Sequence, residues 1–313
     1  MKRWILAALS LSLILCGCAS SSYKRSTERG EIYKISLAAM LDKVQRKDTF
    51  AVMLTQTYCG YCQDFEEMLT AYLKDHEQNS IVGVSNKMVA KYMDAIVICY
   101  EKCFEEFGRE KTRLLGNPRA TNAVHAKFDR DYFLSLGLSL HKPLILVVMG
   151  SLGSTSVNAI MKDALPAVSE RYQILFVTGK NNYEEMRKQI HAPHVKVVDY
   201  VKQLDIMAHV DLIVCRAGAT TAAEITALGT PSILVPSPYV AHNHQFYNAS
   251  VLVDHKAAVM LEEKDLNAEA LSNAIDRIMS DDLLRASMHS ASLALGKPNA
   301  SEDILNWCDE MKR

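Results

Sequence analysis

The sequence predicts an α/β protein whose larger part is a doubly wound parallel sheet. Short apolar runs alternate with helical patterns through the second half of the chain. These runs are apolar throughout, as expected for strands that are buried on both faces. Two of them lead through a glycine turn into the start of a helix, at Gly150–Ser154 and at Gly218–Ala219. Ligands of such sheets bind at the carboxyl ends of the strands, where both turns are expected to lie.

The individual elements of this sheet follow from the same pattern. One helix is expected from about Ser156, and another over Ala219–Leu228 with threonines in its first turn. Because helical patterns separate the apolar runs, neighbouring strands are expected to be parallel. The predicted strands span residues 144–149, 174–178, 195–198, 212–215, 232–235 and 258–261.

Composition limits the class of protein. The chain has 313 residues, enough for about two domains, and 49% of them are hydrophobic, so it can bury a large core. A formal net charge of -1 argues against a nucleic-acid-binding protein, which normally carries a basic excess. The cysteines do not form a compact disulfide framework. We interpret four of them as ordinary core or surface thiols: Cys99, Cys103, Cys215 and Cys308.

The N-terminus has the pattern of an export signal. Lys2 and Arg3 form a positive segment, and the apolar run Trp4–Leu15 that follows is too short to span a membrane. Leu15-Cys-Gly-Cys18 resembles the end of a bacterial lipoprotein signal, which implies that Cys18 is lipidated after cleavage. Residues 1–18 are therefore interpreted as a lipoprotein-type signal peptide and residues 19–30 as a polar tether. The alternative is an accidental apolar N-terminus.

A second short region suggests thiol chemistry. Thr49–Thr55 is a predicted strand, and Cys59-Gly-Tyr-Cys62 opens a helical pattern that continues to Lys74. A cysteine at a helix start has its thiolate stabilised by the helix dipole. Residues 31–75 resemble the first part of the thioredoxin-like family, with Cys59 and Cys62 as a possible redox pair. Nothing after Lys74 supplies the second half of that fold. Half of a metal site is the alternative, but no second cysteine pair follows at zinc spacing.

The most informative segment connects a strand to a helix start. Asp211–Cys215 is a predicted buried strand, and Gly218 permits a tight turn before the helix. A helix start presents unpaired backbone N–H groups and a positive dipole end to an anion. Glu224 lies one turn into the helix, where a carboxylate can accept hydrogen bonds from a ribose diol. We interpret this segment as a nucleotide-sugar site; for Glu224 the alternative is a solvated helix carboxylate.

Five motifs occur in the order found in the bacterial MurG family, glycosyltransferase family 28. They are His76-Glu-Gln-Asn79, Gly116-Asn-Pro-Arg119, Gly150-Ser-Leu-Gly153, Cys215-Arg-Ala-Gly218 with Glu224, and Gln245-Phe-Tyr-Asn-Ala249. The resemblance covers about residues 76–310. It implies a two-domain GT-B fold, with residues 119–313 as the C-terminal donor domain and residues 76–118 as the end of the first domain. Each motif is weak alone, but five in register are specific.

The resemblance also implies an activity and its site. The family's hexosyltransferases move N-acetylglucosamine, with inversion and no obligatory cofactor, from UDP-N-acetylglucosamine to a lipid-linked muramoyl-pentapeptide. This peptidoglycan step takes place at the cytoplasmic membrane surface. The implied contacts are Ser151 for the diphosphate, Val201 for uracil, Ala219, Thr220, Thr221, Ala222 and Ala223 for phosphates and sugar, Glu224 for ribose, and Gln245 and Asn79 for N-acetylglucosamine. For Gln245 the alternative is a surface amide. His242 and His244 lack a third ligand, so no metal is expected.

The chain departs from the family pattern in its first domain. It contains no Gly-Gly-Thr-Gly-Gly-His motif, the loop that carries the family's base histidine, so no catalytic residue is assigned. Residues 76–118 resemble only the last helix and strand of that domain. An exported lipoprotein start also conflicts with a cytosolic transferase, which favours a fused reading frame near residue 75. Impaired transfer is therefore expected. The alternatives are a non-catalytic nucleotide-sugar-binding remnant and an exported redox lipoprotein with an inert tail.

Overall fold

The computed structural model describes residues 78–91, 93–150 and 154–311, with the backbone alone at a few positions of the first helix. It also describes the backbone of four earlier strands, β1 (Ser12–Cys18), β2 (Tyr33–Ile35), β3 (Thr49–Thr55) and β4 (Asp75–Glu77). The chain divides into two compact units. Unit 1 contains the described residues up to Pro118 together with those from Asn299, and unit 2 is Arg119–Pro298.

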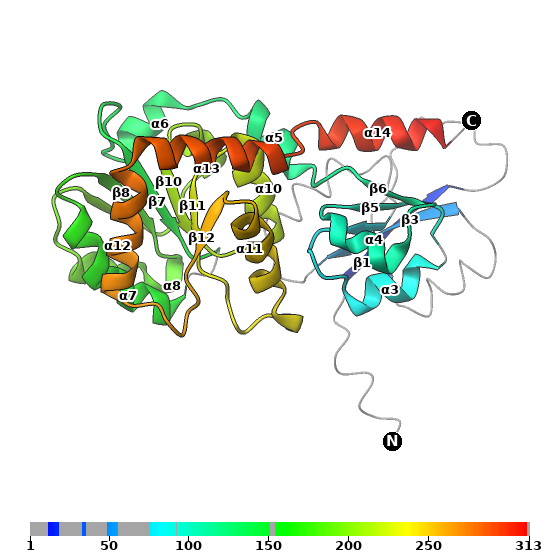
Figure 1. The fold of residues 1–313 in the computed structure, drawn as a ribbon, viewed down its shortest axis with the longest axis horizontal. Coiled ribbons are helices and arrows are strands. Elements are labelled where there is room, and N and C mark those ends of the chain that lie inside the picture. Colours follow the sequence, from blue (N-terminus) through cyan, green and yellow to red (C-terminus); the bar gives the residue numbers. More distant parts are fainter. Residues whose placement is uncertain are drawn as a thin grey trace, which may run out of the picture. The chain divides into compact units, whose positions relative to one another are not determined.

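Unit 2 is built on a parallel sheet of six strands (Figure 1). The strand order is β12-β11-β10-β7-β8-β9, and every neighbouring pair is parallel. The strands are β7 (Leu144–Val148), β8 (Gln173–Val177), β9 (Val195–Val198), β10 (Leu212–Cys215), β11 (Ser232–Leu234) and β12 (Ala258–Met260). The predicted doubly wound sheet is confirmed, and each strand lies within a residue or so of its expected position.

The strand order determines where a ligand can bind. From β7 the chain moves to β8 and β9 on one side, and then returns to place β10, β11 and β12 on the other side. The direction of winding therefore changes between β7 and β10. In open α/β sheets the crevice at this switch point, outside the carboxyl ends of the strands, is the usual ligand site. The turns that follow β7 and β10 are the two glycine turns singled out from the sequence.

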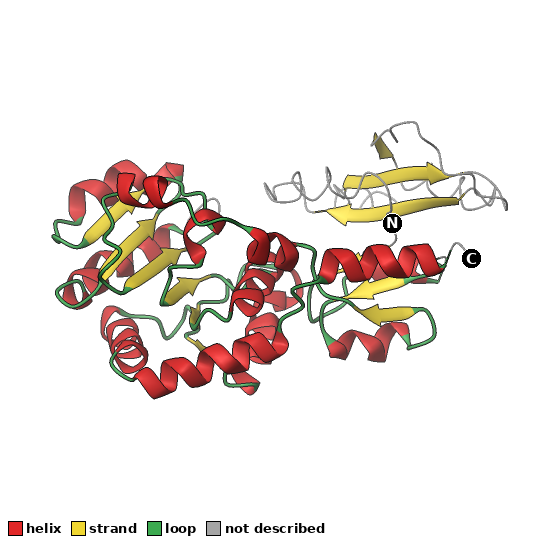
Figure 2. Ribbon diagram, turned by 90° about the horizontal axis from the view of Figure 1, so that it is seen from above, coloured by secondary structure: helices red, strands yellow, loops and turns green. Residues whose placement is uncertain are grey.

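Helices cover both faces of this sheet (Figure 2). α10 begins and ends where the sequence predicted, and α7 begins one residue before the expected start. The helices of unit 2 are α5 (Arg119–His125), α6 (Arg130–Ser135), α7 (Thr155–Val168), α8 (Lys180–Gln189), α9 (Leu204–Met207), α10 (Ala219–Leu228), the short 3-10 helix η2 (Ala241–Asn243), α11 (His244–Asp254), α12 (Ala268–Met279) and α13 (Asp282–Leu295).

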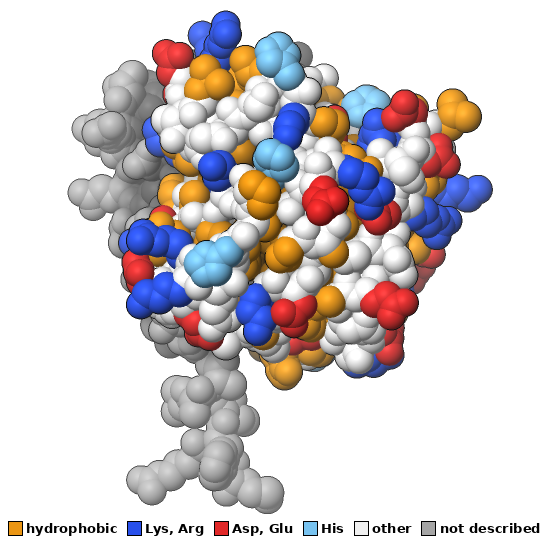
Figure 3. All heavy atoms as spheres, turned by 90° about the vertical axis from the view of Figure 1, so that its left-hand side faces the viewer, with side chains coloured by type: hydrophobic (Ala, Val, Ile, Leu, Met, Phe, Trp, Pro, Cys, Tyr) orange, Lys and Arg blue, Asp and Glu red, His pale blue; other side chains and the backbone are white. Residues whose placement is uncertain are grey.

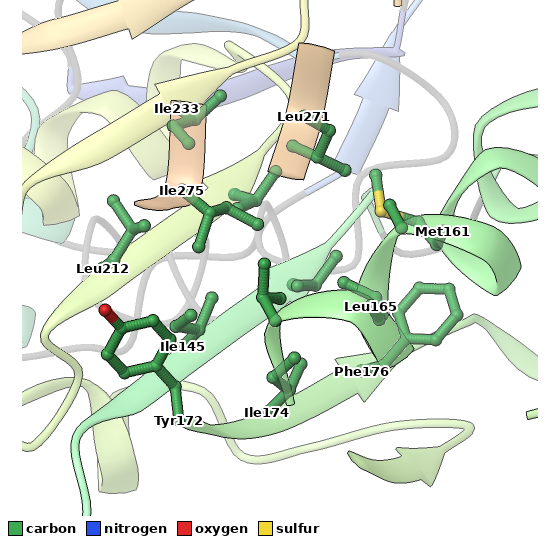
Figure 4. Packing of buried hydrophobic residues seen from close by; sticks show 14 of the residues in the cluster. Ile145, Met161, Leu165, Tyr172, Ile174, Phe176, Leu212, Ile233, Leu271 and Ile275 are labelled. Atoms are coloured by element: carbon green, nitrogen blue, oxygen red, sulfur yellow. The ribbon is translucent and has the colours of Figure 1, made fainter. Parts of the chain in front are cut away.

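Alternate residues of each strand point to opposite faces and form two cores. On one face Ile145, Ile174 and Leu212 pack with Met161 and Leu165 of α7 and with residues of α12 (Figure 4). On the other face Leu144, Leu146, Leu175 and Ile213 pack against α9, α10 and α11. Both faces of the central strands are therefore apolar, which is why their sequences read as continuous apolar runs.

The surface of unit 2 shown in Figure 3 mixes acidic and basic side chains with scattered apolar ones. No single sign of charge dominates that face, in keeping with the formal net charge of -1. Among the described residues, no helix has the length and apolar character needed to cross a membrane.

Unit 1 contains a parallel sheet of three short strands in the order β4-β5-β6. The expectation of a single strand in residues 76–118 was wrong, because β4 and β6 carry polar side chains and give no apolar run. Its elements are β5 (Ile96–Ile98), β6 (Thr112–Leu114), α3 (Val84–Ala90), the 3-10 helix η1 (Glu101–Cys103), α4 (Phe104–Phe107) and α14 (Ala300–Glu310).

The last helix belongs to unit 1, so the predicted donor domain of residues 119–313 was wrong at its C-terminal end. Ile304 and Cys308 of α14 are buried against Val97 of β5. The guanidinium of Arg113 lies 5.7 Å from the centre of the Trp307 ring. The chain thus returns to its first unit after completing the second, which local sequence patterns do not indicate.

The structure describes only part of the N-terminal region for which the sequence makes predictions. β3 coincides with the predicted strand Thr49–Thr55, and it pairs antiparallel with β1 in a sheet of order β2-β1-β3. β1 ends at Cys18 and overlaps the predicted export signal. Lipidation of Cys18 stays a prediction, and Cys59 and Cys62 lie outside the described residues.

Candidate functional site

The turn between β10 and α10 has the geometry expected of an anion site. Gly218 is the N-terminal cap of α10 and supplies no side-chain cap to the first N–H groups of the helix. Ala219, Thr220, Thr221 and Ala223 are partly exposed, whereas Ala222 is buried against the sheet. The first turn of α10 therefore offers both backbone and hydroxyl donors at the switch point of the sheet.

The turn between β7 and α7 lies beside it in the strand order. Gly150 has a φ of 81°, a left-handed conformation that favours glycine, and α7 starts at Thr155 after Ser154 as its cap residue. Residues 151–153 lie outside the described residues, so the diphosphate contact predicted for Ser151 stays a prediction.

Arg216 joins the loops around this switch point. Its guanidinium donates to the Val235 carbonyl at 3.1 Å and to Ser154 Oγ at 2.8 Å, and it forms an ion pair with Glu263 at 2.8 Å. Ser156 Oγ donates to the other Glu263 oxygen at 2.7 Å. The loops after β7, β10, β11 and β12 are thus tied together by one arginine and one carboxylate at the carboxyl edge.

Glu224 is buried, so the interpretation of a solvated helix carboxylate was wrong. Glu224 as a whole residue is only 1% exposed. Arg119 Nε donates to its Oε1 at 2.7 Å, and Gln203 Nε2 donates to its Oε2 at 2.9 Å. The carboxylate is therefore held by one donor at each oxygen, from α5 on one side and from the cap of α9 on the other.

Burial dominates the electrostatics of this carboxylate. Loss of hydration raises the pKa of Glu224 above its usual value, while the charge and hydrogen bond of Arg119 and the hydrogen bond of Gln203 oppose that rise. Burial, followed by the nearby Glu224 charge, also raises the pKa of the Cys215 thiol. Cys215 is thus a neutral core thiol, as the sequence suggested.

The segment after β9 reaches the same place. Val201 is buried, Tyr200 is exposed, and Gln203 turns its side chain toward α10. Tyr132 Oη accepts a hydrogen bond from the backbone N–H of Lys202 at 3.0 Å. Val201, which is expected to present its backbone to uracil, is therefore two residues from Gln203. Gln203 in turn donates a hydrogen bond to Glu224, which is expected to bind ribose.

Gln245 is positioned by the loop after β11. Its Oε1 accepts a hydrogen bond from the Ser237 N–H at 2.8 Å. Just before it, His242 and Asn243 both have left-handed backbones, with φ of 53° and 52°. Asn248, one turn further along α11, donates to the Ala217 carbonyl at 3.1 Å. These contacts bring Gln245 to the carboxyl edge of the sheet beside the β10–α10 turn.

Asn79 lies in unit 1, where its backbone carbonyl accepts a hydrogen bond from Cys103 Sγ at 3.2 Å. The sugar contact expected of its side chain stays a prediction.

Three residues of the site were not singled out from the sequence: Arg119, Gln203 and Arg216. Arg119 and Arg216 each stand in a motif that carried the family resemblance, Gly116-Asn-Pro-Arg119 and Cys215-Arg-Ala-Gly218. A search for a cation to pair with Glu224 could therefore have found Arg119. Gln203 gave no signal, because a lone amide between two apolar segments has no pattern of its own.

The second half of the chain is similar to a known protein family. Residues 144–304 match the family model described as the glycosyltransferase family 28 C-terminal domain. The chain is 41% identical over 239 residues to the UDP-N-acetylglucosamine--N-acetylmuramyl-(pentapeptide) pyrophosphoryl-undecaprenol N-acetylglucosamine transferase of Limosilactobacillus reuteri, covering 74% of this chain and 64% of that protein. It is 38% identical to the Bacillus subtilis protein of the same name, covering 76% and 67%. The chain thus spans about two thirds of these relatives.

Solved structures show the same fold. A crystal structure of Acinetobacter baumannii MurG aligns with a TM-score of 0.67 at 22% identity, covering 92% of this chain and 85% of that one. A Staphylococcus aureus MnaA structure with UDP aligns with a TM-score of 0.58 at 14% identity, covering 76% and 68%. At these identities the likeness concerns the fold alone.

Proposed function

The chain belongs to glycosyltransferase family 28, and from this membership we propose that unit 2 binds UDP-N-acetylglucosamine as the donor of a hexosyl transfer. The proposed acceptor is a lipid-linked muramoyl-pentapeptide, which would make the reaction a step of peptidoglycan synthesis. The names of the relatives at about 40% identity support both substrates. The chain spans only 64% to 67% of those relatives, so the activity is a proposal for this chain.

One observation carries the donor assignment. The buried Glu224 carboxylate lies one turn into α10, held at both oxygens, beside a helix start at the switch point of the sheet. A nucleotide diphosphate needs N–H donors for its phosphates and an oriented acceptor for its ribose hydroxyls. The α10 start and Glu224 offer these two features within one helix. The proposal places Ser151 at the diphosphate, Val201 at uracil, and Gln245 and Asn79 at the sugar.

The proposed reaction is a direct displacement. The acceptor hydroxyl oxygen forms a bond to the anomeric carbon while the bond from that carbon to the diphosphate oxygen breaks, so the configuration inverts. The electron pair of the broken bond leaves with UDP, whose charge the N-terminus of α10 stabilises. The acceptor's proton passes to a base that we do not assign to any described residue. We propose that the reaction takes place at the cytoplasmic surface of the membrane. The predicted export signal of residues 1–18 conflicts with this location.

We expect donor binding to be retained and transfer to be weak, because the sequence lacks the family's Gly-rich loop and its histidine. Positioning of two reactants can account for roughly 7–11 kcal/mol of a barrier. The test is calorimetry of the full chain with UDP, UDP-N-acetylglucosamine and ADP, followed by incubation with the labelled donor and a lipid-linked muramoyl-pentapeptide. Binding of both uridine ligands but not of ADP supports the donor assignment. No uridine binding by folded protein overturns it, and transfer at the rate of an intact relative contradicts the expected impairment.

A further inference from the structure

We propose that Gln203 is a positioning residue that holds the Glu224 carboxylate in the orientation needed to accept hydrogen bonds from the ribose hydroxyls of the donor. The inference rests on the proposed function, since it takes Glu224 as the group that meets the ribose. Gln203 would act through Glu224 and need not touch the nucleotide itself.

The contacts of Glu224 define its orientation from two directions. Gln203 Nε2 lies 2.9 Å from Oε2, and Arg119 Nε lies 2.7 Å from Oε1. A carboxylate that is held at one oxygen alone can still rotate about its last side-chain bond. Because each oxygen has its own donor, and the two donors come from different elements, this rotation is stopped.

The remaining acceptor capacity matches a ribose diol. An ionised carboxylate presents about four acceptor positions on its two oxygens. Among the described residues, Arg119 and Gln203 occupy one position on each oxygen of Glu224. One position on each oxygen is left, and the 2′ and 3′ hydroxyls of a ribose supply two O–H donors. The two donors, Arg119 and Gln203, therefore set the direction of the two remaining acceptor positions.

Gln203 is itself held in place. It is 7% exposed and caps α9, whose Met207 N–H donates to the Gln203 carbonyl at 3.0 Å. Its amide nitrogen also lies 3.3 Å from the Met207 sulfur. Because the residue stands two positions after Val201, it couples the segment proposed for uracil to the carboxylate proposed for ribose. A fixed amide in this position is better suited to orienting a neighbour than a mobile surface glutamine.

The same hydrogen bond favours the ionised form of Glu224. Burial raises the pKa of the carboxyl, and the donors Arg119 and Gln203 lower it. Cys215 of β10 is another titratable group close to Glu224, and burial raises its pKa so that the thiol is neutral. Removal of the Gln203 amide should therefore shift the protonation of Glu224 to higher pH. This pH signature would not arise if Gln203 served packing alone.

The test compares two nucleotides that differ only in the ribose. Calorimetry on the full chain measures the Kd of UDP and of 2′,3′-dideoxyuridine diphosphate between pH 5 and pH 8, for the unchanged protein and for Gln203→Met. The control variant is Gln189→Met, because Gln189 Nε2 also donates to a glutamate, Glu185 Oε1, at 3.1 Å, but on the exposed surface of α8. Circular dichroism checks that each variant is folded.

The Gln203→Met variant should lose affinity for UDP but not for the dideoxy nucleotide. Its UDP affinity should fall about tenfold, the scale of a lost hydrogen bond to a charged group, while its affinity for the dideoxy nucleotide changes by less than about twofold. The loss of UDP affinity on acidification should begin at higher pH than in the unchanged protein. Gln189→Met should alter none of these values. Equal losses for both nucleotides, or no loss, would overturn the proposal.

A second variant keeps the proposal testable if Gln203→Met does not fold. Gln203→Glu preserves the size of the side chain but places a second carboxyl beside Glu224, where the two share a proton once the pH is low enough. The shared proton restores a donor to Glu224, so UDP affinity of this variant should rise as the pH falls. A fall, as in the unchanged protein, would contradict the positioning role. If the unchanged chain binds neither nucleotide, the proposed function fails first, and this inference fails with it.

Discussion

Arg216 and Glu263 form an ion pair of 2.8 Å between the loops after β10 and β12, and both side chains are only about one tenth exposed. The pair also reaches Ser154 and Ser156 at the start of α7. Because the loops after β7 and β10 flank the switch point of the sheet, this pair lies beside the place where the donor is proposed to bind. Because both charges are largely buried, removing one partner leaves the other buried and uncompensated, whereas an exposed ion pair contributes little.

Glu263→Ala should lower the free energy of unfolding by about 3 kcal/mol, because it leaves the Arg216 charge buried without its partner. The matched control is Glu262→Ala, which removes the neighbouring carboxylate from an exposed pair with Lys264 at 3.2 Å. That change should cost less than about 1 kcal/mol. Urea unfolding of the full chain measures both. Equal effects of the two substitutions would show that the Arg216–Glu263 pair has no special structural role.

Glu224→Ala should weaken UDP binding by roughly 1–3 kcal/mol, the scale of losing hydrogen bonds to a charged group. It also removes the partner of Arg119, so urea unfolding must show that the variant is folded under the binding conditions. Glu185→Ala, on the exposed surface of α8, is the control.

A fragment of residues 119–298 should bind UDP as the full chain does, because it corresponds to unit 2. A folded fragment without UDP binding would refute the donor assignment.

Gly229→Ala should destabilise the protein by roughly 2–4 kcal/mol. Gly229 ends α10 with a φ of 70°, and an added Cβ would lie 2.6 Å from ring atoms of His289 and 2.7 Å from Leu293 Cγ. His289 has little room to move, because its Nδ1 lies 2.7 Å from the Gly229 carbonyl oxygen. The control is Gly218→Ala, where φ is -68° and no atom lies within 4 Å of the added Cβ. Thermal unfolding measures both, and similar midpoints would contradict the expectation.

The Cys59–Cys62 pair should form a disulfide that is easily reduced but not an efficient redox catalyst. A helix start stabilises a thiolate, yet no second half of a thioredoxin-like fold follows in the sequence. Reduction of insulin in the presence of dithiothreitol is the measurement, with a Cys59→Ser and Cys62→Ser double variant as the control. Turnover at the rate of a thioredoxin would favour the exported redox lipoprotein over the other interpretations.

Local sequence patterns were sufficient to locate the parallel sheet of unit 2 and the helix that carries the candidate site. Strands buried on both faces must be apolar along their whole length, so Leu212–Cys215 and its neighbours were visible as local patterns. The start of α10 was visible for a similar reason, since Gly218 and the following threonines form a local signal. Residues of unit 1 gave weaker signals, because short polar strands such as β6 lack an apolar run.

The surroundings of Glu224 and the packing of the last helix, α14, could be seen only in the folded arrangement of the chain. The partners of its carboxylate are Arg119, which is 105 residues away in the sequence, and Gln203, which is 21 residues away. Local propensity carries no information about such pairs, because they form only when strand order brings distant segments to one edge of the sheet. The packing of α14 against unit 1 could not be predicted for the same reason. The apolar face of α14, which contains Ile304 and Cys308, shows that this face is buried. Only the fold shows that it is buried against Val97 of unit 1.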